Sequence, residues 1–231
     1  MSQINATYVD HMGDDLSVVN AARVSFGKSS QLVFTDDPDD YGSLSERDAK
    51  LINYLAKHKH ISPFGHAFAS FHVKAPIFVA RQLVKHKFLR INEISRRYVD
   101  DEPEFYAPDT WRGKSADKKQ GSSDEEVDVA YYDRDDGYND WPTDANSVAL
   151  EAYQEMLKLG VAPEMARMVL PQSTLTEFHW AGSLDAFAAM CRLRCASDTQ
   201  YESRVVADQI SEKMSELFPV SWDALIGGQD E

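Results

Sequence analysis

Cysteine is nearly absent from this sequence of 231 residues, which holds only Cys191 and Cys195. The two lie in a segment rich in Ala, Phe and Met, where we expect them to have a buried apolar role on a helix. Such a pair is no disulfide framework and is typical of reduced cysteines in the cytoplasm. The N-terminal residues also lack a basic region followed by an apolar run, so we expect no signal peptide.

Long hydrophobic runs are missing as well. The most apolar stretch, residues 67–84, is interrupted by His72, Lys74, Pro76 and Arg81. A membrane-spanning helix needs about 20 consecutive apolar residues. We therefore expect no membrane span and no membrane partner.

The sequence also lacks the short motifs of the common nucleotide and hydrolase folds. It contains no G-x-G-x-x-G, no Walker A loop, no G-x-S-x-G elbow and no H-E-x-x-H. Five histidines do gather in the first half, but their spacing matches no zinc pattern. They are His58, His60, His66, His72 and His86. We expect no metal site, and interpret these histidines as pocket or core residues.

Positive charge is scarce overall but concentrated in one place. The chain has 24 Lys and Arg against 38 Asp and Glu, a net charge of −14, which argues against nucleic-acid binding. Residues 81–97 nevertheless carry six cations: Arg81, Lys85, Lys87, Arg90, Arg96 and Arg97. Two interpretations stay open at this point. The run is either a solvated surface face or a pocket for a small anion.

The periodicity of apolar residues predicts an α+β protein in which helices dominate. The strands are expected at 65–75 and 173–180, and the helices at 16–26, 45–60, 76–88, 147–160, 184–197 and 202–218. Neither half has enough strands for a sheet of its own, so we expect a single domain over residues 1–231.

An acidic segment interrupts this pattern at about residues 115–146. It has ten acidic and three basic residues, hence a net charge of −7. Such a composition favours a solvated or disordered insertion. Its aromatic residues indicate that part of it docks on something: Tyr131, Tyr132, Tyr138 and Trp141.

Two similar strand–helix units occur in the chain. Phe71-His72 precedes a helix that is followed by Lys85 and Lys87, and Phe178-His179 precedes a helix that ends at Arg192 and Arg194. Cations at a helix C-terminus complement its dipole. An anion-binding pocket between the two units would produce the same pattern, a strand and a helix followed by two cations in each unit.

Residues 85–98 combine cations with groups that can form hydrogen bonds to a heterocyclic ring. Lys and Arg bind phosphate by charge, while Asn92, Glu93 and Ser95 offer hydrogen bonds to a heterocycle. The combination favours a phosphorylated heterocycle over bare phosphate.

Together these residues resemble the flavin-dependent thymidylate synthases. The signature of that family is Arg-His-Arg, seven intervening residues and Ser, and here Lys85-His86-Lys87 precedes Ser95 at that spacing. Asn92-Glu93 and Arg97-Tyr98 also match. Further similar blocks are AARVSF, KHKHISPFGH, FHVKAPIFVARQ, ARMVLP and the region of Arg194. Both arginines of the triplet are lysines here.

The resemblance implies an enzyme that methylates dUMP to dTMP in dTMP biosynthesis. 5,10-Methylenetetrahydrofolate would supply the carbon, and FAD reduced by NADPH would supply the hydride. It also implies the α+β fold of that family, with a mixed sheet and flanking helices, in a homotetramer whose active sites combine residues of several subunits.

The resemblance also implies roles for individual residues. Contacts to dUMP are expected from Gln82, Lys85, Glu93, Ile94, Ser95, Arg96, Arg97, Arg167 and Arg194. Contacts to FAD are expected from Ser62, Lys85, His86, Lys87, Glu93, Ser183 and Asp185. Arg194 is the expected catalytic residue, since a guanidinium beside the uracil imide stabilises its deprotonated form. We interpret Ser95 as a ligand rather than a nucleophile.

Two alternatives keep the same pocket. One is a flavin-dependent hydroxymethylase of pyrimidine nucleotides, and the other is a non-catalytic relative that binds dUMP. The second is motivated by Ser183, Asp185, Ala189 and Asp198, which replace the Asn, Arg, Asn and His usual in the family.

Overall fold

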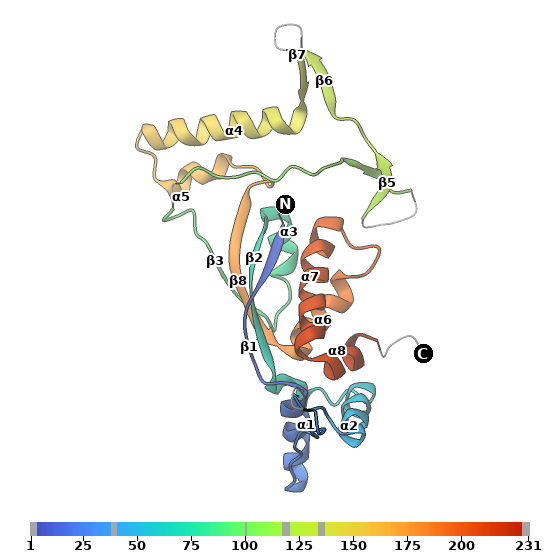
Figure 1. Ribbon diagram of the computed structural model, residues 1–231. Helices are drawn as coiled ribbons and strands as arrows, with labels where there is room; N and C mark the ends of the chain where they lie inside the picture. The colour runs from blue at the N-terminus through green and yellow to red at the C-terminus, as the bar shows by residue number, and fades with distance from the viewer. Residues whose placement is uncertain (1–3, 38–40, 100, 117–120, 134–136, 228–231) are drawn as a thin grey trace.

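The computed structural model describes residues 4–227 except 38–40, 100, 117–120 and 134–136. Its centre is a four-stranded sheet in the order β1-β2-β8-β3 (Figure 1). These strands are β1 (Asn5–Met12), β2 (Phe68–Pro76), β3 (Arg90–Glu93) and β8 (Leu175–Ser183). The predicted α+β class is confirmed. The sheet, however, is antiparallel at every described pairing, where a mixed sheet was expected.

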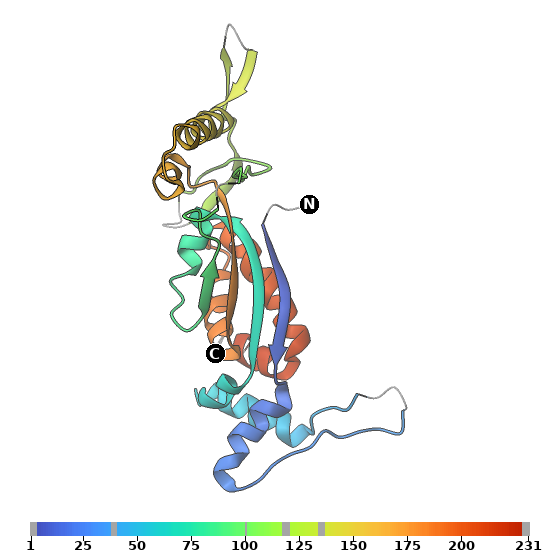
Figure 2. The ribbon, with the colours of Figure 1, turned by 90° about the vertical axis from the view of Figure 1, so that its left-hand side faces the viewer.

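Helices cover one face of the sheet, and the hydrophobic core lies between these helices and the sheet. They are α3 (Ile77–Leu83), α6 (Leu184–Arg194), α7 (Tyr201–Leu217) and α8 (Pro219–Ile226). Residues alternate along β8, so that Thr176, Phe178 and Trp180 are buried. Trp180 packs edge-on against Phe187 of α6 at 5.8 Å between ring centroids. Figure 2 looks onto the other face, with α6–α8 behind the sheet.

The chain turns sharply between α3 and β3, where the sequence predicted helix as far as residue 88. The helix ends at Leu83, and the amide of His86 donates to the Leu83 carbonyl over 3.1 Å. The turn lies close on β8: a Cβ at Gly182 would come within 2.5 Å of Leu89 Cδ2. Directly after this turn, β3 pairs with β8, with Arg90 opposite Ala181.

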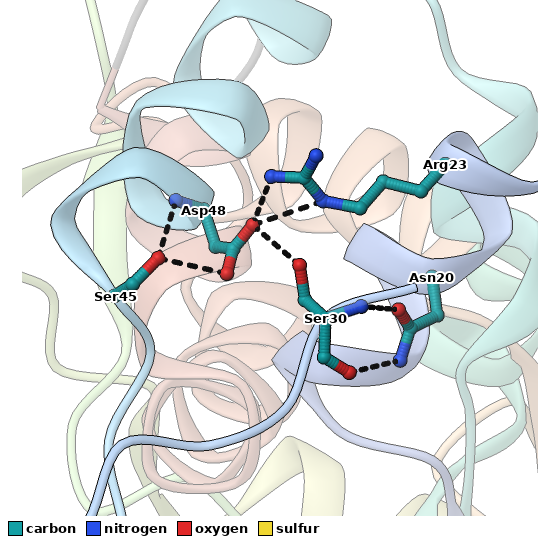
Figure 3. A network of polar contacts seen from close by, with 5 residues as sticks. All are labelled: Asn20, Arg23, Ser30, Ser45 and Asp48. Atoms are coloured by element: carbon teal, nitrogen blue, oxygen red, sulfur yellow. Dashed lines mark hydrogen bonds and ion pairs between the residues drawn. The ribbon is translucent and has the colours of Figure 1, made fainter. Parts of the chain in front are cut away.

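A compact polar network holds the lower end of the molecule, around α1 (Asp15–Arg23) and α2 (Glu46–Lys57) (Figure 3). Asp48 is 3% exposed and accepts hydrogen bonds from Arg23 Nε at 3.1 Å, Ser30 Oγ at 2.9 Å and Ser45 Oγ at 2.8 Å. Ser30 and Ser45 lie near the two ends of the long connection between α1 and α2. One carboxylate therefore fixes both ends of this connection. The short 3-10 helices η1 (Val24–Phe26) and η2 (Ser62–His66) complete this end.

The upper end contains the acidic segment. Its described residues form two hairpins and the first turns of a long helix, and none of those with a described exposure is buried, as expected of a solvated insertion. The elements here are β4 (Arg112–Lys114), β5 (Ser122–Glu126), β6 (Ala130–Asp133), β7 (Gly137–Asp140), α4 (Trp141–Lys158), α5 (Pro163–Ala166) and η3 (Arg167–Val169). Tyr131 stacks on Trp141 at 4.1 Å, so these two aromatics contact each other. Among the described helices, none is long and apolar enough to cross a membrane.

Candidate active site

A cavity of about 280 Å³ opens where β3 leaves the sheet. It brings together five of the residues expected to contact dUMP, with apolar groups and one threonine around them. The lining comprises Ile77, Glu93, Ile94, Ser95, Arg96, Arg167, Leu170, Leu175 and Thr176. Segments that lie more than 70 residues apart in the sequence thus meet in one concave site, as a small-molecule pocket requires.

Strand pairing places the acidic side of this cavity. β3 runs antiparallel to β8 with Glu93 opposite Phe178, so Glu93 points to the helix-covered face. Its carboxylate accepts a hydrogen bond of 2.6 Å from Thr176 Oγ1. Beyond the strand, the amide of Ile94 donates to the Glu177 carbonyl at 2.9 Å. The backbone is thereby fixed up to the residue before Ser95.

Arginines surround the cavity with different degrees of constraint. Arg96 is largely buried and donates to the carbonyl of Asp101 at 2.9 Å. Arg167 is exposed, and its Nε donates to the Glu164 carbonyl at 3.3 Å. Arg97 does not line the cavity; its Nε lies 3.7 Å from the Glu164 carboxylate. One side of the cavity therefore carries two guanidinium groups, those of Arg167 and of Arg96, and the latter is also paired with the Asp101 carboxylate at 3.4 Å.

Gln82, His86 and Arg194 form a second cluster, and none of them lines that cavity. Arg194 Nε donates to His86 Nε2 at 3.2 Å, and its Nη2 donates to the Gln82 carbonyl at 3.2 Å. A guanidinium has five N–H donors, and the described residues engage two of them. The others are available to an anionic or carbonyl ligand.

The contact with Arg194 determines the state of His86. Because Arg194 donates to Nε2, this nitrogen carries a lone pair and the imidazole is neutral. Burial and the charge of Arg194 both lower the pKa of His86, and burial lowers the pKa of Arg194. In this triplet, positive charge therefore comes from the lysines alone. His86 is also engaged with Arg194 and makes no hydrogen bond to Ser95 among the described contacts.

Lys85 and Lys87 lie on the exposed turn after α3. Within the described part of the chain, neither lysine has an ion-pair partner. Phe88 beside them is 81% exposed. Two uncompensated cations next to an exposed aromatic ring fit the binding of an anion that carries a planar group.

The remaining residues predicted for the flavin lie near the N-terminus of α6. Ser183 is its N-cap residue, and Asp185 lies in its first turn. Oδ1 of Asp185 is buried and has no hydrogen-bond partner among the described residues. η2, which begins at Ser62, packs against α6, and a Cβ at Gly65 would lie 4.0 Å from Asp185 Oδ1. The structure thus brings Ser62, Ser183 and Asp185 to one end of the sheet.

Sequence reasoning missed the polar residues around Gln82. Gln200 Oε1 accepts a hydrogen bond of 2.6 Å from Gln82 Nε2, and Ser203 Oγ donates to Gln82 Oε1 at 3.1 Å. Both belong to the start of α7. The one available signal was a cluster of polar residues, QYES at 200–203, at the beginning of an amphipathic helix.

The two cysteines have the expected free state. Cys191 is buried and its thiol donates to the Ala207 carbonyl at 3.6 Å. Burial raises the pKa of the Cys191 thiol, so it is a poor nucleophile. In the described residues, no group of three or more His, Cys, Asp or Glu could hold a metal ion.

Comparisons with known proteins identify the family of this chain. The sequence model of a family described as "Thymidylate synthase complementing protein" matches residues 7–220. A flavin-dependent thymidylate synthase of Thermus thermophilus is 40% identical over 220 residues, covering 94% of this chain and 73% of the relative. That of Thermosipho melanesiensis is 35% identical over 226 residues, covering 94% and 88%.

Solved structures extend the similarity to the fold. A UMP/dUMP methylase, PolB from Streptomyces cacaoi, bound with 5-Br dUMP, superposes with a TM-score of 0.75 at 31% identity. The match covers 98% of this chain and 96% of that one. The chain belongs to the flavin-dependent thymidylate synthase family.

Proposed function

We propose that the protein catalyses the reductive methylation of dUMP to dTMP with 5,10-methylenetetrahydrofolate and NADPH, using FAD. The observation that carries this proposal is the cavity that joins Glu93, Ile94, Ser95, Arg96 and Arg167. It offers cations for a phosphate and hydrogen-bonding groups for a pyrimidine at the same place. The two free cysteines fit a reducing compartment such as the cytoplasm.

Each part of the site has a separate task in this proposal. Arg96 and Arg167 bind the phosphate, and Glu93 and Ser95 bind the sugar or base. Arg194 stabilises negative charge that develops on the uracil imide, which raises electron density at the carbon to be alkylated. A cysteine adduct is not required, in agreement with the buried state of Cys191.

The residues present fit a flavin. Lys85 and Lys87 have no described ion-pair partner and suit the phosphates, with His86 between them as a neutral hydrogen-bonding group. The unpartnered oxygen of Asp185 can accept a hydrogen bond from a hydroxyl or an N–H group, with Ser62 and Ser183 nearby. Reduced FAD supplies the hydride of the reaction when bound.

The active site is shared between subunits of a homotetramer in this proposal. Arg167 lines the cavity, whereas Arg194 belongs to the cluster with Gln82 and His86. A nucleotide that contacts both arginines would do so most simply if they came from different chains. The face of the sheet in Figure 2, which no described helix covers, leaves room for such assembly.

A direct assay tests this function. Purified protein should show flavin absorbance after addition of FAD, and should release tritium from 5-tritiated dUMP with NADPH and methylenetetrahydrofolate. Mass spectrometry of the product then separates methylation from hydroxymethylation. Absence of both flavin binding and tritium release would contradict the proposal.

A non-catalytic protein that binds dUMP is the second candidate. The observation that favours it is the carboxylate of Asp185, which brings a negative charge to a position expected to contact the anionic cofactor. Calorimetry with FAD and dUMP distinguishes the two. Binding of dUMP without any binding of FAD would support the second candidate and contradict the first.

A further inference from the structure

A chain of hydrogen bonds connects the side chain of Gln82 to a buried ion pair on α7. Glu202 is 4% exposed and forms an ion pair with Arg112 of β4. Gln200 Nε2 donates to Glu202 Oε2 at 3.1 Å, and Gln82 Nε2 donates to Gln200 Oε1 at 2.6 Å. The chain ends where Ser203 Oγ donates to Gln82 Oε1 at 3.1 Å. Strand β4 is thus connected to Gln82, which is expected to contact the nucleotide.

The Glu202 carboxylate determines which group donates and which accepts in each hydrogen bond of this series. A side-chain amide can be turned by 180° with little change in shape, so its orientation depends on its partners. An ionised carboxylate only accepts hydrogen bonds. Gln200 must therefore point its NH2 group at Glu202 and its oxygen at Gln82. Gln82 must in turn point its NH2 group at Gln200.

The orientation leaves Gln82 with a single kind of hydrogen bond to offer. One N–H of its amide binds Gln200, and the Nε2 atom also lies 3.5 Å from the Phe78 carbonyl. The oxygen has two lone pairs, one of which accepts from Ser203. The capacity left by the described contacts is therefore that of an acceptor.

Arg112 keeps the carboxylate in place. Its Nε donates to Ser122 Oγ at 2.9 Å, and its guanidinium lies 4.5 Å from the centre of the Tyr201 ring. The hairpin of β4 and β5 therefore fixes Arg112 from one side and α7 from the other. If Glu202 lost its charge, the contacts of Arg112 with Ser122 and Tyr201 would remain. The side-chain amides of Gln200 and Gln82, however, would no longer be held in one orientation.

We infer that Glu202 is a positioning residue that, through Gln200, presents Gln82 to the nucleotide as a hydrogen-bond acceptor. The inference rests on the proposed function and on the expected contact of dUMP with Gln82, whose carbonyl accepts a hydrogen bond from Arg194. A dUMP molecule with an ionised phosphate has two hydrogen-bond donors, the imide N–H and the 3′-hydroxyl. Gln82 therefore selects ligands that carry one of these donors in the correct place.

The test compares three ligands by calorimetry: dUMP, its N3-methyl analogue and its 3′-deoxy analogue. One neutral hydrogen bond is worth about 1.4 kcal/mol, or about tenfold in affinity. Wild-type protein should bind dUMP about tenfold more tightly than one of the two analogues, and that analogue identifies the donor. In Glu202→Gln, where both amides are free to turn, this preference should fall to about twofold or less.

Two further variants keep the test decisive. Gln200→Met removes the middle of the chain without disturbing the buried ion pair, and should lose the preference in the same way. Glu212→Gln changes an exposed carboxylate of the same helix, and this variant should keep the wild-type preference for dUMP over the analogue. A general loss of structure would weaken all three ligands equally, whereas the inference requires a change in their ratio.

The outcomes separate the inference from the proposed function. If wild-type protein binds dUMP but neither analogue is weaker, or if Glu202→Gln and Gln200→Met keep the wild-type ratio, the inference is wrong and the function stands. If wild-type protein binds no dUMP, the proposed function is wrong and the inference falls with it.

Discussion

Replacing Asp48 by asparagine tests how strongly one buried carboxylate stabilises the lower end of the fold. The carboxylate is 3% exposed and is bound by Arg23, Ser30 and Ser45 (Figure 3). Asparagine has nearly the same shape but no charge and one acceptor oxygen instead of two. It would leave Arg23 without a counter-charge and would present an NH2 group to a hydroxyl or a guanidinium.

The expected loss in the free energy of unfolding follows from the guanidinium of Arg23, which the substitution leaves without its ion-pair partner. Breaking a buried ion pair at one partner costs about 3–5 kcal/mol. Because asparagine retains one acceptor, we expect the lower end of this range, about 3 kcal/mol. For a chain of this size that corresponds to a decrease in Tm of about 6–12 °C. Asp208→Asn, the same change at an exposed site on α7, should change Tm by less than about 2 °C.

The pH dependence gives an independent check. Burial raises the pKa of Asp48, but hydrogen bonds from Arg23, Ser45 and Ser30 outweigh it and hold the pKa below the ordinary value of 3.8. A carboxyl group with a lowered pKa stabilises the fold above its unfolded pKa, and this stabilisation is lost as pH falls through its folded pKa. The difference between wild type and Asp48→Asn should therefore be full at neutral pH and narrow in acid.

Thermal unfolding followed by circular dichroism, at equal protein concentration, measures both effects. The reasoning is refuted if Asp48→Asn and Asp208→Asn unfold within about 2 °C of each other at pH 7. It is also refuted if the difference between Asp48→Asn and wild type grows toward low pH.

Three further predictions concern the proposed active site. Arg194→Ala should lower kcat by at least about a hundredfold, because the removal of one preorganised group that stabilises the transition state has an effect of this size. Its Tm should stay within a few degrees of wild type. Full activity of this variant would exclude a catalytic role for Arg194. Mixing inactive Arg167→Ala and Arg194→Ala subunits should restore about a quarter of the sites if each site combines two chains, and nothing if it lies within one chain. Lys85→Ala with Lys87→Ala should weaken FAD by about tenfold or more in an absorbance titration, whereas Arg90→Ala should leave FAD affinity unchanged.

Much of the fold could be predicted because it depends on apolar periodicity. The helix expected at 45–60 corresponds to α2, and the strands expected at 65–75 and 173–180 correspond to β2 and β8. β3 was missed because all four of its residues are exposed, which leaves no alternation to detect. Its position depends instead on pairing with β8, which is a tertiary contact.

The candidate site shows the same division. The sequence could place Glu93, Ser95 and Arg96 together because they follow one another along the chain. It could not show that Arg97 turns to Glu164, or that Gln82 depends on Glu202, because these contacts join distant segments. Local sequence thus indicates which groups are available, and long-range packing decides how they are oriented.

The resemblance between the two strand–helix units has a physical meaning in the structure. β2 and β8 pair directly, with His72 opposite His179, and each strand continues into a helix on the same face of the sheet. Arg194, the last residue of α6, donates to the carbonyl of Gln82 in the last turn of α3. An arginine at a helix C-terminus is stabilised by the dipole and the free carbonyls there. Arg194 is therefore held by α3 on one side while its remaining donors stay available, which is how a chain of net charge −14 can keep a fixed cation at an anion site.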